Sequence, residues 1–255
     1  ASVLKRHRLV VPANQREYAW EEGHIERLFQ DISRAISEGD SSYFLGTVVT
    51  IRRGNHLEVV DGQQRLATTA LLIHAMADHL AGKVEMLEQA LRNEFLFTVD
   101  RKQLERVPRL TLNSIDNDFF KAVITDMHPR PKATKPSHEL IAESSRLAKA
   151  QVRKIVAPLD ESDHGDQLDR WVTFLEEKAK VVLLIVSDDA NAYRMFETLN
   201  DRGLRVSQAD LVKNYLYGRA GDRLEEAATK WSLIRGTLEA LSDDDALIDF
   251  LRHSL

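Results

Sequence analysis

Residues 59–72 read VVDGQQRLATTALL, and the fold of the surrounding chain depends on this stretch. An apolar run ends abruptly at Asp61-Gly62, and apolar residues then return at helical spacing on one face as far as Leu80. The pattern predicts a strand, a tight turn and a helix. The first turn of that helix would carry three polar side chains, those of Gln63, Gln64 and Arg65.

The start of the predicted helix has the features of an anion-binding site. The first N–H groups of a helix have no partners within it, and they carry the positive end of the helix dipole. Arg65 adds a planar guanidinium suited to phosphate oxygens. The residues therefore predict a cradle for a nucleotide phosphate. An ordinary turn is the alternative, in which Asp61 caps the helix and Arg65 lies in solvent.

Composition limits the class of protein. The chain has 255 residues, of which 43% are apolar and 29% charged, and it contains no cysteine, which excludes disulfides, a thiolate nucleophile and a cysteine zinc site. No apolar run approaches the roughly 20 residues of a membrane helix, and the basic start of the chain lacks the apolar core of a secretory signal. These features predict a cytoplasmic protein with no membrane association. The formal charge of −5 argues against charge-driven binding to DNA.

The remaining pattern combines a few short strands with many helices. Strands are predicted at 9–12, 43–51, 56–60, 109–112 and 181–186. The last of these is continuous, apolar and β-branched, which is typical of a buried strand. Helices are predicted at 21–38, 84–97, 116–127, 138–157, around Trp171 and Leu175, at 190–199, from Ser207 onward, and at 221–241. The fold class predicted is α+β, mostly helical, with a small sheet at its core.

The order of these elements suggests three parts. Residues 1–82 would form the nucleotide-binding core, residues 83–178 a helical region, and residues 179–255 a strand and helices that complete the site. The apolar helical pattern still runs at Leu255, so we expect the parent chain to continue toward a C-terminal effector domain.

Four polar clusters are candidates for a single nucleotide site. They are Gln15 with Arg16, the segment from Asp61 to Arg65, Glu197 with Asn200 and Arg202, and Asp210 with Lys213 and Asn214. Arginine, lysine and amide side chains suit a triphosphate, and carboxylates suit Mg²⁺ or an attacking water. Each cluster alone is more often a surface or capping feature, and periodicity cannot show that the four converge.

The sequence lacks the motifs of several enzyme classes. It has neither a G-x-x-x-x-G-K-[ST] loop nor a G-x-G-x-x-G turn, so it is neither a P-loop NTPase nor a Rossmann enzyme on motif grounds. None of its nine histidines has metal-ligand spacing. We expect His74, near the apolar face of its helix, to be a packed core residue.

Several of these segments, taken in order, resemble a known family. Residues 11–20 (VPANQREYAW), 43–47 (YFLGT), 61–66 (DGQQRL) and 196–203 (FETLNDRG) resemble the N-terminal domain of GmrSD-type restriction endonucleases, also called the domain of unknown function 262 family. Ser207, Asp210, Lys213 and Asn214 continue the last segment, and residues 250–253 (FLRH) resemble a later element. The resemblance covers nearly all of residues 9–255.

The resemblance implies both a fold and an activity. The fold would be similar to the ParB and sulfiredoxin superfamily, in which a loop–helix turn holds nucleotide phosphates. The activity would be binding and Mg²⁺-dependent hydrolysis of a nucleoside triphosphate (NTP), which controls cleavage of DNA, including modified phage DNA, by an HNH-type nuclease domain or subunit. These 255 residues contain no such nuclease motif, and sulfiredoxin chemistry needs a cysteine that the chain lacks.

The resemblance also assigns roles to individual residues. Arg65 and the N–H groups after Gly62 would hold phosphates, and Gln63 and Gln64 would orient phosphate or water. Asp61 would bind Mg²⁺ or activate the attacking water, although its position equally suits a turn-stabilising hydrogen bond. Further nucleotide contacts would come from Gln15, Arg16, Tyr18, Asn200, Arg202, Lys213 and Asn214.

Three other functions stay open at this point. The chain can be a non-catalytic sensor of a nucleotide or of modified DNA, which would bind without turnover. It can be a metal-dependent nuclease, which the acidic balance and the lack of a ligand cluster disfavour. It can also be a structural interaction module that no nucleotide affects. The preferred NTP and the oligomeric state, including a homodimer, are not set by the sequence.

Overall fold

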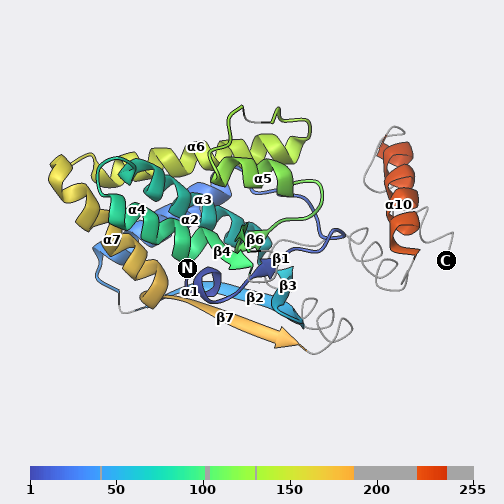
Figure 1. Cartoon of the computed structure of the whole chain (residues 1–255), viewed down its shortest axis with the longest axis horizontal. Coiled ribbons are helices and arrows are strands. Elements are labelled where there is room, and N and C mark those ends of the chain that lie inside the picture. The colour runs from blue at the N-terminus through green and yellow to red at the C-terminus, as the bar shows by residue number, and fades with distance from the viewer. Residues whose placement is uncertain (41, 101–103, 130, 187–222, 240–255) are drawn as a thin grey trace.

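The computed structural model describes residues 1–40, 42–100, 104–129, 131–186 and 223–239. Over these residues a mixed β-sheet is covered by helices, which is an α+β arrangement (Figure 1). The α+β class and the predominance of helix predicted from the sequence are confirmed.

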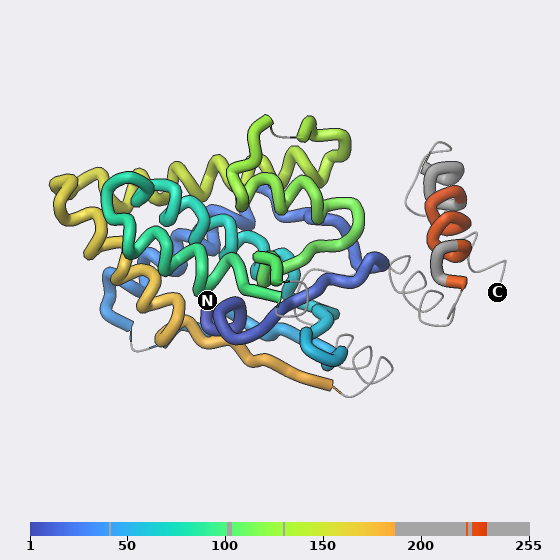
Figure 2. The backbone as a smooth tube through the Cα atoms, viewed as in Figure 1, coloured from blue at the N-terminus to red at the C-terminus, as the bar shows by residue number. Residues whose placement is uncertain are grey.

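The described sheet has the strand order β6-β1-β3-β2-β7. Its strands are β1 (Leu9–Val10), β2 (Tyr43–Arg53), β3 (His56–Asp61), β6 (Leu110–Thr111) and β7 (Ala179–Val186). β2 and β3 form the predicted antiparallel hairpin, whereas β1 runs parallel to both β3 and β6. β7 returns from far along the chain to lie parallel to β2 (Figure 2). A separate two-stranded sheet contains β4 (Phe97–Asp100) and β5 (Glu105–Pro108).

Helices make up most of the described chain. The α-helices are α1 (Ser2–Arg6), α2 (Glu22–Ser37), α3 (Gln63–Leu80), α4 (Glu85–Leu91), α5 (Asn117–Ile124), α6 (Pro136–Val156), α7 (His164–Thr173) and α10 (Leu224–Glu239). The π-helical turns η1 (Arg92–Leu96) and η3 (Phe174–Lys178) follow α4 and α7, and η2 (Glu161–Asp163) is a 3₁₀ turn. Figure 1 shows α4, α5 and α6 on one side of the molecule and β2 and β7 on the other.

Helix α3 is the central helix of this arrangement. It packs against α4, α6 and α7, and nearly all of its residues are buried. The sequence predicted an apolar stripe on one face, but the structure also buries polar side chains of α3 such as Thr68 and Thr69, because other helices cover the sides turned away from the sheet. His74 is fully buried, as predicted, and its Nε2 lies 3.3 Å from Asp126 Oδ1.

Most predicted elements are present within a few residues of their expected bounds. The ends of α2 and α3 are followed by Gly39 and Gly82, whose φ angles of 71° and 73° suit glycine. The predicted helix at 84–97 is shorter than expected, because a π turn ends it and Phe97 begins β4. The β4–β5 hairpin was not predicted. The predicted helices at 190–199 and after Ser207 lie outside the described residues.

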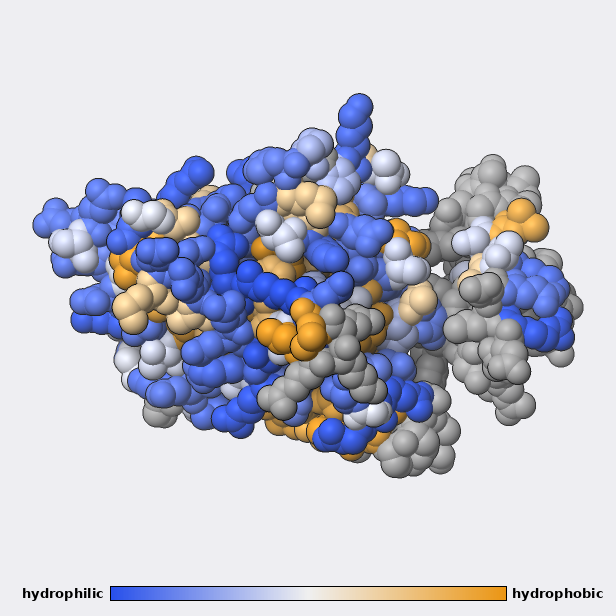
Figure 3. Space-filling model, in the orientation of Figure 1, coloured by the Kyte–Doolittle hydropathy of each residue, from blue (hydrophilic) through white to orange (hydrophobic). Residues whose placement is uncertain are grey.

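The prediction that 181–186 is a buried strand is wrong. β7 lies at the edge of the described sheet, and the side chains of Val182 and Ile185 are 46% and 42% exposed. Figure 3 shows hydrophobic side chains along the lower edge of the molecule, where β7 lies in Figure 1. A continuous apolar run therefore marks a strand here without marking burial on both faces.

The main hydrophobic core takes side chains from β1, α2, the hairpin, α3 and the helices that follow, as far as Ala179. The division of the chain into 1–82, 83–178 and 179–255 stays a prediction. None of the helices within the described ranges is both long and apolar enough to cross a membrane.

Candidate anion-binding site

The turn between β3 and α3 is built by a bulge and a left-handed glycine. The pairing of β2 with β3 slips by one residue between Val49 and Thr50, where Asp61 ends β3. Such bulges re-aim the neighbouring side chains. Gly62 follows with φ 95°, and a Cβ atom there would lie 2.9 Å from a Val48 methyl carbon. Glycine is therefore required between strand and helix.

A second glycine makes room for Arg65. Gly46 in β2 has φ 109°, and a Cβ atom at this position would lie 2.9 Å from Arg65 Nη1 and 3.1 Å from its Cζ. The pairing of β2 with β7 is also irregular between Phe44 and Gly46. The guanidinium of Arg65 thus lies directly against the β2 backbone, in space that any larger residue at Gly46 would fill.

The charged side chains of the turn affect one another. Burial lowers the pKa of Arg65, and this is opposed by attraction to Asp61 and Tyr43. Burial raises the pKa of Asp61, and this is opposed by a hydrogen bond from the Gly62 backbone and by attraction to Arg65 and Arg16. Over the described residues, neither Arg65 nor Arg16 has a carboxylate oxygen within 4.0 Å. A half-buried cation without a counterion favours the binding of an anion.

The first N–H groups of α3 add to this positive potential. The first backbone hydrogen bond of the helix runs from Leu66 N to Gly62 O. Within the described part of the chain, the N–H groups of Gln63, Gln64 and Arg65 donate to no backbone oxygen and to no capping side chain. Free N–H groups, the helix dipole and a guanidinium thus lie together, which is the arrangement expected of an anion-binding site.

The side chains of Gln63 and Gln64 hold the loop that precedes α2. Gln63 Nε2 donates to Arg16 O at 2.9 Å. Gln64 Nε2 donates to Glu17 O at 3.0 Å, and Gln64 Oε1 accepts from Ala19 N at 2.8 Å. Both glutamines are buried. Their amides therefore position the backbone that carries Arg16.

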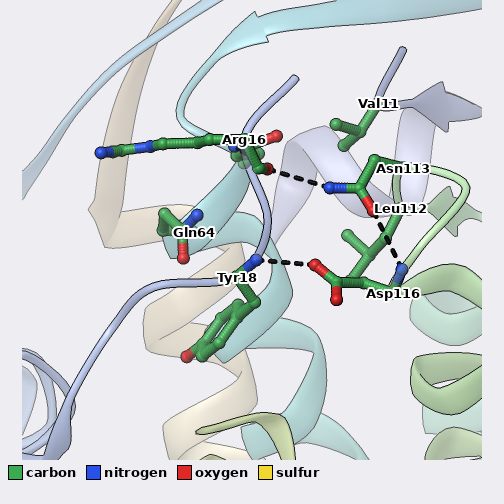
Figure 4. Close-up of a pocket in the computed structure, with 8 residues that line it drawn as sticks. Val11, Arg16, Tyr18, Gln64, Leu112, Asn113 and Asp116 are labelled. Atoms are coloured by element: carbon green, nitrogen blue, oxygen red, sulfur yellow. Dashed lines mark hydrogen bonds between the residues drawn. The ribbon is translucent and has the colours of Figure 1, made fainter. Parts of the chain in front are cut away.

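Asn113 and Asp116 hold the same loop from the other side (Figure 4). Asn113 Nδ2 donates to Arg16 O at 3.0 Å, and Tyr18 N donates to Asp116 Oδ2 at 2.6 Å. The Ser137 hydroxyl donates to Asp116 Oδ1 at 2.6 Å. We refer to four of these buried side chains as the loop anchor: Gln63, Gln64, Asn113 and Asp116.

The side chains of Tyr18 and Arg16 point in different directions. The Tyr18 hydroxyl is buried, lies 2.7 Å from Thr68 Oγ1 and donates to Ser144 Oγ at 3.1 Å. Figure 4 shows the Arg16 side chain extending away from Asn113. Tyr18 is thus a packing residue of the loop, whereas Arg16 is free to contact a ligand.

The small cavity between the loop and its anchor is not a nucleotide pocket. It is lined by the loop anchor, Arg16 and Tyr18 among others, and it has room for about one water molecule (Figure 4). An anion would therefore bind outside this cavity, at the guanidinium groups and the start of α3.

The structure brings the loop that carries Arg16 next to the predicted segment from Asp61 to Arg65. Gln15 takes part through its carbonyl oxygen, which accepts from Asn113 Nδ2 at 3.3 Å. Four predicted nucleotide contacts lie outside the described residues: Asn200, Arg202, Lys213 and Asn214.

Sequence reasoning missed three residues that shape the site: Gly46, Asn113 and Asp116. Gly46 was visible in the YFLGT segment, but its contact with Arg65 was not. Nothing in the sequence around Asn113 and Asp116 indicated a contact with Arg16 or Tyr18, because these pairs are far apart in the chain.

Among the described residues of this turn, Asp61 is the carboxylate that could contact a metal ion. Across the described residues, no group of three or more histidine, aspartate and glutamate side chains is placed to hold a metal ion. A single carboxylate beside an anion site fits Mg²⁺, which is commonly bound by one or two carboxylates together with phosphate oxygens and water.

Comparison of the sequence with protein families identifies a family that matches most of the chain. The sequence model of a family described as "GmrSD restriction endonuclease, N-terminal domain" matches residues 1–217. The matched range includes the turn at Asp61–Arg65, both glycines and the whole loop anchor. No curated protein sequence matches the chain.

Proposed function

The chain belongs to the GmrSD restriction endonuclease N-terminal domain family, and we propose that it is the nucleotide-binding regulatory domain of a restriction system. Membership of the family makes the chain a component of such a system. One observation carries the rest of the proposal. Arg65 lies half-buried against Gly46, beside the free N–H groups of α3, and over the described residues no carboxylate lies within 4.0 Å of it.

The proposed ligand is the phosphate chain of an NTP. Arg65 and the first N–H groups of α3 would bind its oxygens, and Arg16 would approach from the loop. Gln63 and Gln64 would act by holding that loop in place, because their amides are engaged by its backbone.

Asp61 is the proposed acid–base and metal-binding residue. Its burial raises the pKa of the carboxyl group, which favours proton transfer from a water molecule nearer to neutral pH. The same carboxylate would hold Mg²⁺ together with phosphate oxygens, and the bound ion would neutralise phosphate charge. Asn200, Arg202, Lys213 and Asn214 are proposed to complete the site from the C-terminal part of the chain.

The wider assembly is also part of the proposal. The strand–glycine–helix turn supports a relation to the ParB and sulfiredoxin superfamily. Nucleotide binding would control cleavage of DNA, including modified phage DNA, by an HNH-type nuclease domain or subunit. Whether the domain works as a homodimer is left to measurement of its mass in solution.

A non-catalytic nucleotide sensor is a second candidate function. It is favoured by the engagement of both glutamine amides with the loop, which leaves Asp61 as the residue of this turn that can activate water. Release of inorganic phosphate from an NTP would identify hydrolysis. Binding without release would identify the sensor.

Thermal unfolding with and without each NTP and Mg²⁺ tests the proposal. A ligand at about 100 times its Kd stabilises a protein by roughly 2.7 kcal/mol, which is several degrees for a chain of this size. We expect such a shift for the parent protein and for Arg27→Ala, an exposed arginine of α2. Arg65→Ala should abolish it. A parent protein that no nucleotide stabilises, or an unchanged shift in Arg65→Ala, would contradict the proposal.

A further inference from the structure

A basic pocket lies between η1, the β4–β5 hairpin and α5. It has a volume of about 150 Å³ and shares no residue with the turn at Asp61–Arg65. Its lining residues are Arg92, Phe97, Arg106, Pro108, Lys121 and Thr125. Three of these six side chains are cationic, although the chain as a whole is acidic.

The three cations differ in how they are paired. Arg92 is neutralised locally, since its Nε lies 2.6 Å from a Glu88 oxygen and its Nη2 lies 3.3 Å from Asp126 Oδ2. Arg106 and Lys121, by contrast, have no carboxylate oxygen within 4.0 Å over the described residues. Arg92 thus completes the wall, and the other two supply uncompensated positive charge.

Arg106 is held in position by neutral groups. Its guanidinium carbon lies 4.2 Å from the centre of the Phe97 ring, and its Nη2 donates to Asn93 Oδ1 at 3.0 Å. Burial and repulsion by Arg92 lower the pKa of Arg106, but an arginine remains protonated at neutral pH. An ordered guanidinium with unused N–H donors is a common feature of phosphate sites.

We propose that this pocket binds a single phosphate group between Arg106 and Lys121. At about 150 Å³ it can accept a phosphate group but is smaller than the several hundred Å³ typical of a pocket that holds a whole NTP. The phosphate can come from a DNA backbone or from the end of a free nucleotide. The two sources are separated by experiment. The proposal is independent of the nucleotide site at α3, because the two sites have no residue in common.

The test compares two double variants that change the net charge equally. Arg106→Gln with Lys121→Gln removes the pocket's unpaired cations. Arg27→Gln with Lys154→Gln removes one exposed arginine and one exposed lysine from α2 and α6, which do not line the pocket. All four side chains are exposed, so both variants should unfold within a few degrees of the parent, and the melting temperature checks this.

Affinity is measured with a fluorescent DNA duplex of about 20 base pairs at several salt concentrations, and separately with NTP and Mg²⁺. We expect the pocket variant to bind DNA about tenfold more weakly than the control variant, with a salt dependence reduced by about 0.9 in slope, as for the loss of one phosphate contact. NTP binding should be unchanged.

A pocket variant that loses affinity for NTP and not for DNA would also support a phosphate site and would assign the phosphate to the nucleotide. The proposal is overturned if both double variants weaken binding equally, since the effect would then be one of general charge. It is also overturned if the parent protein binds neither DNA nor NTP.

Discussion

Gln63 and Gln64 of the loop anchor lie on the same short segment as the charged residues of the turn, yet the two pairs of residues differ in how fully their polar atoms are paired. The buried amides of Gln63 and Gln64 have partners at normal hydrogen-bond distances. Arg65, one or two residues further on, has no carboxylate partner within 4.0 Å among the described residues. Buried polar groups that serve stability are normally paired. The comparison therefore separates residues that build the site from residues kept for a ligand, and each prediction below tests that division.

The largest effect is expected for Asp116→Ala. This change leaves Tyr18 N and the Ser137 hydroxyl, both buried, without their acceptor. Each unsatisfied buried group costs about 1–3 kcal/mol, so we expect a loss of about 3 kcal/mol and a melting temperature lower by roughly 6–12 °C. Asp118→Ala, which changes an exposed aspartate of α5, should cost less than about 0.5 kcal/mol. Equal effects of the two changes would remove Asp116 from the anchor.

A smaller effect is expected for the two glutamines, and it should differ between them. Gln64→Met removes two hydrogen bonds to the loop, whereas Gln63→Met removes one. At about 1 kcal/mol for each bond, we expect unfolding free energies lower by about 2 and about 1 kcal/mol. Urea unfolding measures both. If Gln63→Met lowers the free energy of unfolding more than Gln64→Met does, the hydrogen bonds to the loop do not explain how the two glutamines stabilise the protein.

Arg65→Gln should change stability by less than about 0.5 kcal/mol, because no ion pair is lost. The matched change is Arg92→Gln, which breaks contacts with Glu88 and Asp126 and should cost about 1–2 kcal/mol. Both values come from the same unfolding measurement. A large loss for Arg65→Gln would show that the guanidinium supports the fold and would weaken the case for a ligand.

The smallest expected effect is a change in how the stability of the protein depends on pH. The folded pKa of Asp61 is raised by burial, so the folded protein binds this proton more tightly, and stability falls as pH rises from 3.8 through the raised value. Asp61→Asn removes that loss. The free energy of unfolding of the variant should therefore rise relative to that of the parent between about pH 4 and about pH 7.

Asp126→Asn is the control with the opposite sign. The His74 imidazole, whose Nε2 lies 3.3 Å from Asp126 Oδ1, lowers the pKa of Asp126 to about 2, so the stabilisation by this carboxylate is present above 3.8 and is lost as pH falls through about 2. The stability that Asp126→Asn loses relative to the parent should therefore stay nearly constant between about pH 4 and about pH 7. A constant difference for Asp61→Asn over that range would show that burial does not perturb Asp61.

The sequence predicted the parts of the site that depend on local structure. The change from an apolar strand to a helix fixed the turn at Gly62, and this placed Arg65 and the free N–H groups correctly. The partners of Gln63 and Gln64 could not be predicted, because a glutamine in the first turn of a helix can face a ligand, solvent or another loop. Only the packing of distant segments decides between these.

The fold was predictable to a similar degree. Helix bounds follow from local periodicity and from glycines such as Gly39 and Gly82. Burial depends on neighbours that periodicity does not identify. α3 was therefore predicted with one buried face but has nearly all of its residues buried, and β7 was predicted to be buried but lies at the edge of the described sheet.

The parallel pairing of β2 with β7 has a consequence for biosynthesis. The hairpin and α3 need only residues close in sequence, whereas β2 keeps one edge open until Val186 has left the ribosome. An open strand edge can pair with other chains. We therefore expect closure of this strand pair to be the slow step of folding, and substitutions that weaken β7 to appear first as aggregation of newly made chains, with the helices already formed.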